Sequence, residues 1–185
     1  MEFLQENSMV NPILLIFFAI PVIIAGVIAI PLITSTEVPV TAVDKFDVIE
    51  IEYTKHNLTK VSFGVTERMV SEKSEILIIK NNGDIIYTLV EDGINKPNIT
   101  SKINEDKKTR IIAMIKETGF MAIPTDSFFV NDSVDKYLKS NIKITLNGKT
   151  TQIFWPEQDA TQQLVPPIIT YVETELDSII NQIRN

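Results

Sequence analysis

The sequence predicts an α+β fold: one N-terminal transmembrane helix, then an antiparallel sheet of about four to six strands packed against two helices. Three observations predict it. An uncharged apolar run opens the chain, two segments of alternating polarity turn at Asn-Gly pairs, and two later segments carry apolar residues at helical spacing. The 185 residues fit one domain and an appendage. The expected parts are a polar tail at 1–11, a transmembrane helix at 12–33, an extended stalk at 34–46 and an α+β domain at 47–185.

The composition excludes several classes of protein. The chain has 24 acidic and 17 basic residues, and four of the acidic ones precede the first lysine, Lys45, which leaves 20 against 17 in the domain. A nucleic-acid-binding protein needs clustered Lys and Arg to neutralise phosphates, so no nucleic-acid partner is expected. The sequence has no cysteine, which excludes disulfides, thiolate metal sites and a catalytic cysteine.

The apolar run from Pro12 to Ile33 is long enough to cross a bilayer. It has 22 residues, and about 20 are needed for a helix to span the hydrocarbon core. A cleaved signal peptide would have a positive N-terminal region and a shorter apolar core, whereas MEFLQENSMVN carries two glutamates and no Lys or Arg. A cleavage-like Val40-Thr41-Ala42 keeps a cleaved signal as an alternative, and a buried core helix is another. We favour a permanent anchor in the lipid bilayer.

Small and kinking residues within this run predict helix packing. Pro21 removes a backbone donor in mid-span, and Pro31 does so near the end. Ala25, Gly26 and Ala29 place small side chains on one part of the helix, where a neighbouring helix could approach closely. We therefore expect contact with other membrane-protein subunits, although Pro and Gly are common in membrane helices in general.

The membrane orientation follows from the layout of the chain. Lys45 is the only basic residue near either end of the run, so the positive-inside rule hardly discriminates. A short tail before the run and a long domain after it are typical of a single-pass signal-anchor. The segment TSTEVPVTAVD then forms a polar stalk that leads to an extracytoplasmic C-terminal domain.

The domain begins with strands. Polar and apolar residues alternate from Asp47 to Thr54, and Ser62–Val70 is expected to form a second strand. Two hairpins follow, because Gly and Asn tolerate the positive φ of tight turns. They comprise Glu75–Lys80 and Asp84–Val90 around Asn81-Asn82-Gly83, and Ile142–Leu146 and Lys149–Trp155 around Asn147-Gly148.

Two helices complete the domain. Asn104 is the expected N-cap of the first, which ends at Gly119 with Phe120 folding back onto the apolar face. The second starts at Pro167. Its apolar face is Ile168, Ile169, Val172, Leu176, Ile179, Ile180 and Ile183, and its solvent face is Glu173, Glu175, Asp177 and Gln182.

This order of elements carries a resemblance. The chain has, in order, a strand, an Asn-Gly-Asp turn, a capped helix ending in Gly119-Phe120, an Asn-Gly hairpin and a helix that starts at a proline. In this order it resembles a family of small uncharacterised extracytoplasmic α+β domains of bacteria and archaea with an N-terminal membrane anchor. No catalytic residue follows from it. An N-terminal span before an Ile-, Lys- and Asn-rich domain is also similar to membrane proteins of ammonia-oxidising archaea. That similarity implies an accessory subunit of an enzyme such as ammonia monooxygenase.

Candidate chemistry is sparse. His56, the only histidine, lies in the turn-like YTKHNLT, where a solvated side chain is the simpler interpretation. Asp126, Asn131, Asp132 and Asp135 gather oxygen atoms but lack the EF-hand spacing, and Glu50 with Glu52 fits a solvated strand face. Gly-rich phosphate loops, HExxH and GxSxG are absent from the sequence. We therefore assign no catalytic, cofactor-binding or metal-binding residue.

Aromatic residues are the remaining signal. Phe128-Phe129 stands among polar loop residues, and Trp155 closes the second hairpin. Each belongs either to the core or, if exposed, to an interface with a protein or membrane. The favoured hypothesis is a non-catalytic, membrane-anchored accessory subunit of a larger membrane complex. The alternatives are an independent ligand-binding or sensor domain and, least favoured, an enzyme.

Overall fold

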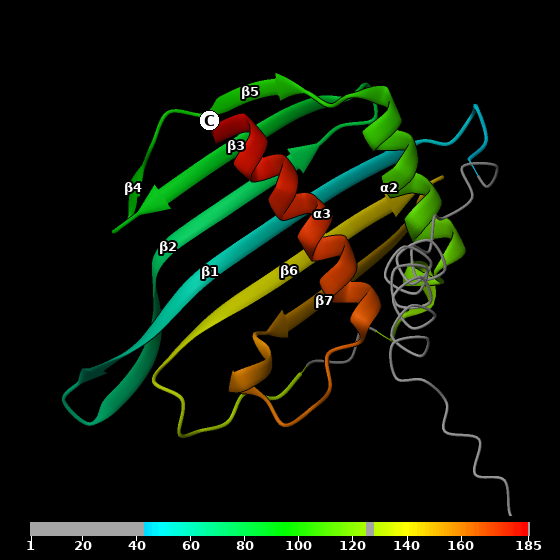
Figure 1. The fold of residues 1–185 in the computed structure, drawn as a ribbon. Coiled ribbons are helices and arrows are strands. Elements are labelled where there is room, and N and C mark those ends of the chain that lie inside the picture. The colour runs from blue at the N-terminus through cyan, green and yellow to red at the C-terminus, as the bar shows by residue number, and fades with distance from the viewer. Residues whose placement is uncertain (1–42, 125–127, 185) are drawn as a thin grey trace, which may run out of the picture. The chain divides into compact units, whose positions relative to one another are not determined.

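The computed structural model describes residues 43–124 and 128–184. They form an α+β domain in which an antiparallel sheet of seven strands carries two helices on one face (Figure 1). The predicted tail, the predicted transmembrane helix and most of the predicted stalk lie outside the described residues. In the two described ranges, no helix combines the length and apolar content needed to cross a bilayer.

The strands are β1 (Ile49–Phe63), β2 (Thr66–Ile79), β3 (Asp84–Glu91), β4 (Ile94–Asn95), β5 (Ile99–Lys102), β6 (Lys136–Leu146) and β7 (Lys149–Pro156). The helices are α2 (Glu105–Glu117) and α3 (Pro167–Arg184), with short 3-10 turns η2 (Phe120–Ala122) and η3 (Gln158–Ala160). The sheet order is β4-β3-β2-β1-β6-β7, and β5 also pairs with β3. Because α2 carries the chain from the β5 edge to β6, β1 lies in the middle, between β2 and β6.

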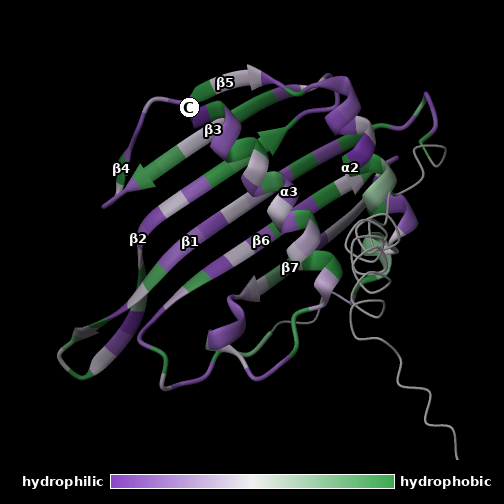
Figure 2. Cartoon of the chain, viewed as in Figure 1, coloured by the Kyte–Doolittle hydropathy of each residue, from purple (hydrophilic) through white to green (hydrophobic). Residues whose placement is uncertain are grey.

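Alternation along the strands gives the sheet two different faces. The inner face, which packs against α2 and α3, holds Ile51 and Tyr53 of β1 beside Leu77, Ile142 and Ile144 of its neighbours, all almost fully buried. The outer face carries the intervening residues of β1, which include Glu50, Glu52 and His56. The apolar core therefore lies between the inner face and the helices. The colouring by hydropathy shows hydrophobic and hydrophilic positions alternating along the strands (Figure 2).

The predicted hairpins and helices are confirmed. The Asn104 side chain accepts a hydrogen bond from the Asp106 backbone N–H at 2.8 Å, which caps α2. Gly119 has the left-handed φ of 71° that ends the helix, and Phe120 is fully buried behind it. Helix α3 starts at Pro167 and buries Ile169, Val172, Leu176, Ile179 and Ile180.

The first strand differs from the prediction. β1 continues nine residues beyond Thr54, and Ser62–Val70 is divided between β1 and β2 by a turn at Gly64, whose φ is 68°. The polar stretch after Thr54 has little strand propensity of its own, but it pairs with β2 on one side and β6 on the other through Thr59. Two-sided pairing therefore overrides the local signal, and His56 lies within a strand rather than in a turn.

Candidate functional site

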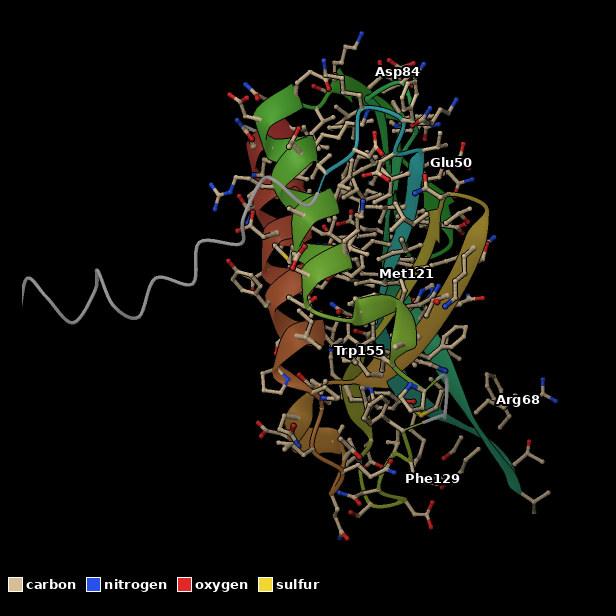
Figure 3. All side chains as sticks on the ribbon, turned by 90° about the vertical axis from the view of Figure 1, so that its right-hand side faces the viewer. Glu50, Arg68, Asp84, Met121, Phe129 and Trp155 are labelled. Carbon is tan, nitrogen blue, oxygen red and sulfur yellow. The ribbon has the colours of Figure 1, made fainter. Side chains whose placement is uncertain are left out.

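The β1–β2 hairpin extends beyond the rest of the sheet. Pairing of β1 with β6 ends at Thr59, and pairing of β2 with β3 begins at Lys73. Within the part of the chain that the structure describes, residues 60–63 and 66–69 thus have no other strand as a pairing partner than each other. We call residues 60–70 the ribbon; it leaves the sheet at one end and, seen from the side, bends away from the helices (Figures 1 and 3).

The tip of the ribbon is apolar and exposed. Phe63 is 59% exposed and Val65 is fully exposed. A two-stranded hairpin is marginal in water without a surface to pack on. Large apolar side chains at the end of such an element are more typical of a contact surface than of a loop that only connects strands.

Two hollows lie at the base of the ribbon and beside it. The larger, of about 440 Å³, is lined by Lys60, Glu67, Arg68, Met69, Val130, Asn131, Asp132, Val134 and Tyr137. The smaller, of about 230 Å³, is lined by Phe128, Val130, Lys139, Phe154, Trp155 and Pro156. Val130 lines both, so the segment before β6 separates two adjacent depressions.

Lys60 fixes the base of the ribbon. Its Nζ lies 2.9 Å from Asp135 Oδ1 and 3.7 Å from Glu67 Oε2, and it donates to the Asp132 carbonyl at 3.1 Å. The hydrogen bond to Asp135 raises the pKa of Lys60. Its backbone N–H donates to the Asp135 carbonyl at 2.7 Å. The loop before β6 is thereby tied to the ribbon, while Arg68 forms no ion pair with any described residue.

His56 lies on the outer face between two cross-strand neighbours, Ser74 and Lys139. Its Nδ1 is 2.7 Å from Ser74 Oγ, which is 2.9 Å from Ser71 Oγ. Burial lowers the pKa of His56, and the nearby charge of Lys139 lowers it further, so the ring is neutral at pH 7. A hydrolytic Ser-His pair needs a third group that orients the imidazole. Ser71 instead donates to the Lys73 carbonyl at 3.1 Å, so this chain of contacts links neighbouring strands.

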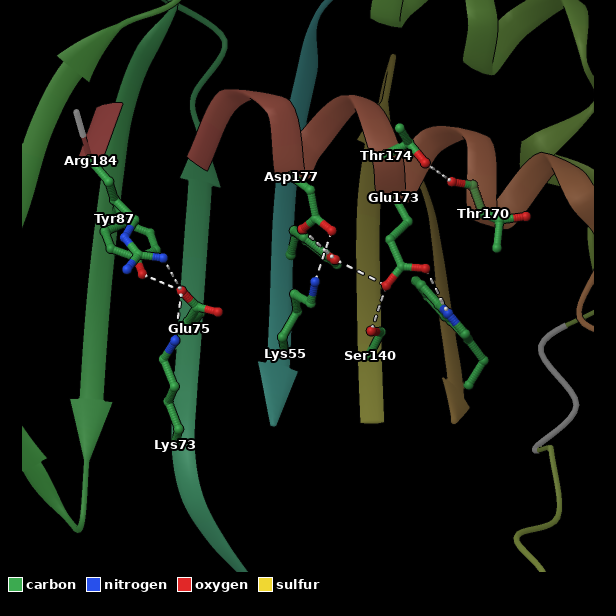
Figure 4. A network of polar contacts seen from close by, with 12 residues as sticks. Lys55, Lys73, Glu75, Tyr87, Ser140, Thr170, Glu173, Thr174, Asp177 and Arg184 are labelled. Carbon is green, nitrogen blue, oxygen red and sulfur yellow. Dashed lines mark hydrogen bonds and ion pairs between the residues drawn. The ribbon is translucent and has the colours of Figure 1, made fainter. Parts of the chain in front are cut away.

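A polar network on the inner face fastens α3 to the sheet (Figure 4). Glu173 accepts hydrogen bonds from Ser140 Oγ at 2.8 Å and Trp155 Nε1 at 3.3 Å. The Tyr53 hydroxyl lies 3.1 Å from Glu173 Oε1 and 3.0 Å from Asp177 Oδ1. Burial raises the pKa of Tyr53 strongly, and the two carboxylates raise it further. The prediction that Glu173 and Asp177 face solvent is therefore wrong, because polar groups of the sheet meet them at the edge of the apolar stripe.

A second carboxylate fastens the end of the same helix. Glu75 Oε1 accepts from the Tyr87 hydroxyl at 2.6 Å and lies 3.4 Å from Lys73 and 3.2 Å from Arg184. Burial alone would raise the pKa of Glu75, but the Tyr87 hydrogen bond and the positive charges of Lys73 and Arg184 outweigh it and leave the pKa below its ordinary value. Both oxygens of Glu173 and one oxygen of Glu75 have donors from the sheet or from α3, so both networks are suited to holding α3 in place.

The predicted aromatic residues have different environments. Phe128 is partly buried against the core, Phe129 is 75% exposed, and Trp155 is 3% exposed and belongs to the core. Trp155 is expected from the sequence to lie either in the core or at an interface, and the structure places it in the core. It also lines the smaller hollow. Pro21, Ala25, Gly26 and Ala29, which are predicted to pack against another helix, lie outside the described residues.

The predicted oxygen-rich residues do not converge. Asp126 lies outside the described residues, and Asp132 and Asp135 contact Lys60. Glu50 and Glu52 are exposed on the outer face, where Glu52 lies 3.8 Å from Lys143. Over residues 43–124 and 128–184, no three His, Asp or Glu side chains are grouped to hold a metal ion. The ribbon and Lys139 were missed by sequence reasoning, because their surroundings come from strand pairing.

Comparison of the chain with protein-family models gave no match, and comparison with curated proteins gave no significant match.

Proposed function

We propose that this protein is a non-catalytic accessory subunit of a membrane complex, anchored by residues 12–33, and that its extracytoplasmic domain binds a partner protein through the ribbon and the adjoining hollows. The observation that carries the proposal is the ribbon itself. An apolar tip, held on two strands that no third described strand supports, gains stability when a partner covers it.

The direction of β1 places the apolar tip far from the first described residue. The described chain starts at Val43, beside the beginning of β1, and β1 has 15 residues. At about 3.3 Å per residue, the tip of the ribbon lies roughly 46 Å from the start of the strand. The tip therefore stands at the end of the domain opposite the start of β1 (Figure 1), where a partner protein can cover it.

Native purification tests this proposal. Membranes containing the full chain are solubilised in mild detergent, and co-migrating proteins are identified and quantified by mass spectrometry. We expect a stoichiometric set of membrane proteins with the unchanged chain and its loss with the double variant Phe63→Ser/Val65→Ser. The matched control, Ile94→Ser/Leu164→Ser, removes two other exposed apolar side chains outside the ribbon and should retain the partners. A chain that purifies alone, or a ribbon variant that keeps every partner, would contradict the proposal.

The identity of the complex stays a prediction. The resemblance to proteins of ammonia-oxidising archaea favours ammonia monooxygenase, and the same mass spectra decide whether its subunits are present.

An independent ligand-binding domain is the second candidate function. The larger hollow favours it, because about 440 Å³ falls within the range of roughly 300–1,000 Å³ for small-molecule sites. Thermal shifts of the full chain in a small-molecule screen test this candidate. Stabilisation that Met69→Trp abolishes would support it, and a screen without any shift would reject it.

A further inference from the structure

The smaller hollow is apolar with one cation at its rim. Phe128, Val130, Phe154 and Pro156 contribute apolar surface, and among the described residues Lys139 alone brings a charge to the lining. Its volume of about 230 Å³ is below the roughly 300–1,000 Å³ of sites for whole ligands. It is therefore better suited to one or two side chains of a polypeptide.

Among the described residues, Lys139 has no counter-charge at this rim. Its Nζ lies 5.7 Å from the centroid of the Phe154 ring, a cation–π distance. It forms no ion pair with any residue in the described ranges, and its cross-strand neighbours are His56 and Pro156. Three carboxylates are engaged with other groups: Glu52 with Lys143, Asp135 with Lys60, and Glu157 with the Leu138 backbone N–H at 3.1 Å.

We propose that the smaller hollow binds an extended segment of the partner protein in which a large apolar side chain stands next to an aspartate or glutamate. The apolar side chain occupies the space between Val130 and Phe154, and the carboxylate pairs with Lys139. This inference rests on the proposed function, because it names the chemistry by which the partner is recognised. Phe129, which is exposed one residue from the lining, extends the apolar contact beyond the rim.

The only tryptophan of the chain provides a direct readout, because Trp155 lines the hollow. The full chain is placed in nanodiscs and titrated with three acetylated hexapeptides, in which leucine alternates with glutamate, glutamine or lysine. We expect the glutamate peptide to change Trp155 emission at the lowest concentration. One partly exposed ion pair predicts a preference of about two- to five-fold over the glutamine peptide at low salt, with the lysine peptide weakest.

A matched pair of variants tests whether Lys139 causes the preference for the glutamate peptide. Lys139→Gln should bind the glutamate and glutamine peptides equally. Lys143→Gln removes a charge from the same face of the same strand but outside the hollow, and should keep the preference. Equal binding of all three peptides by the unchanged chain, or an unchanged preference in Lys139→Gln, overturns the inference.

Other occupants give distinguishable results. Quenching of Trp155 by brominated lipids in the nanodisc would assign the hollow to the bilayer, and a dimer that Lys139→Glu dissociates would assign it to a second copy of the chain. Either result overturns the inference. If the peptides show no preference while native purification still retains a partner that the ribbon variant loses, only this inference fails. If the unchanged chain purifies alone, the proposed function itself fails.

Discussion

Replacement of Glu173 by alanine should weaken the attachment of α3 to the sheet. The carboxylate is the only described hydrogen-bond partner of the Ser140 hydroxyl and of the Trp155 indole N–H. Both donors belong to almost fully buried residues: Ser140 is 2% exposed and Trp155 is 3% exposed. Tyr53 keeps its contact with Asp177, so the substitution leaves two buried donors without an acceptor.

The expected loss follows from these two donors. Each buried donor left unsatisfied costs about 1–3 kcal/mol, and water admitted at the edge of the helix offsets part of this. We therefore expect the free energy of unfolding to fall by about 2–4 kcal/mol in total. For a domain of this size, that corresponds to a decrease in Tm of roughly 6–12 °C.

Urea unfolding of the full chain in detergent, followed by far-ultraviolet circular dichroism, measures this loss. Fluorescence is unsuitable because Glu173 contacts Trp155 directly. Glu175→Ala is the control, since it makes the same change in helix propensity two residues away and should alter the free energy by less than about 0.5 kcal/mol. Equal destabilisation by the two substitutions would refute the role assigned to the network.

Three further predictions concern stability. Because the folded pKa of Glu75 is depressed, its stabilisation is present above the unfolded pKa of about 4.3 and is lost as the pH falls through the folded value. Unfolding measured between pH 2.5 and 7 should therefore show a steeper acid loss in the unchanged chain than in Glu75→Gln, whereas the exposed-site control Glu67→Gln should keep the steep profile. Gly119→Ala should cost about 1 kcal/mol in the same urea assay, because alanine is strained at a φ of 71°, and a neutral result would contradict this. Ile142→Ala should cost about 2–5 kcal/mol at a fully buried position of the central sheet; a loss below 1 kcal/mol would show that the site is not core.

Locally encoded elements could be predicted from the sequence. The turn at Asn147-Gly148, the cap at Asn104 and the left-handed end at Gly119 depend on groups a few residues apart. The apolar spacing of α3 likewise identified the buried side of that helix. These signals sufficed for the α+β class and for the two hairpins.

Elements that depend on partners far along the chain could not be predicted. β1 extends through a polar segment because β2 and β6 pair with it on both sides. Helical period alone places Glu173 and Asp177 beside the apolar stripe, but only the sheet supplies the hydroxyl, indole and ammonium groups that meet them. The strand count of seven also exceeded the prediction, because β4 and β5 are short and exposed.

The candidate site shows the same division. Phe129 stood out in the sequence as an aromatic residue among polar neighbours, whereas Lys139 gave no signal until the β6–β7 register placed it over Phe154. The sequence by itself determined the local turns, helix ends and apolar faces, because their energies act over a few residues. The tertiary structure decided which polar residues meet and which strands lack a neighbour, because these depend on pairing between segments that the chain brings together only on folding.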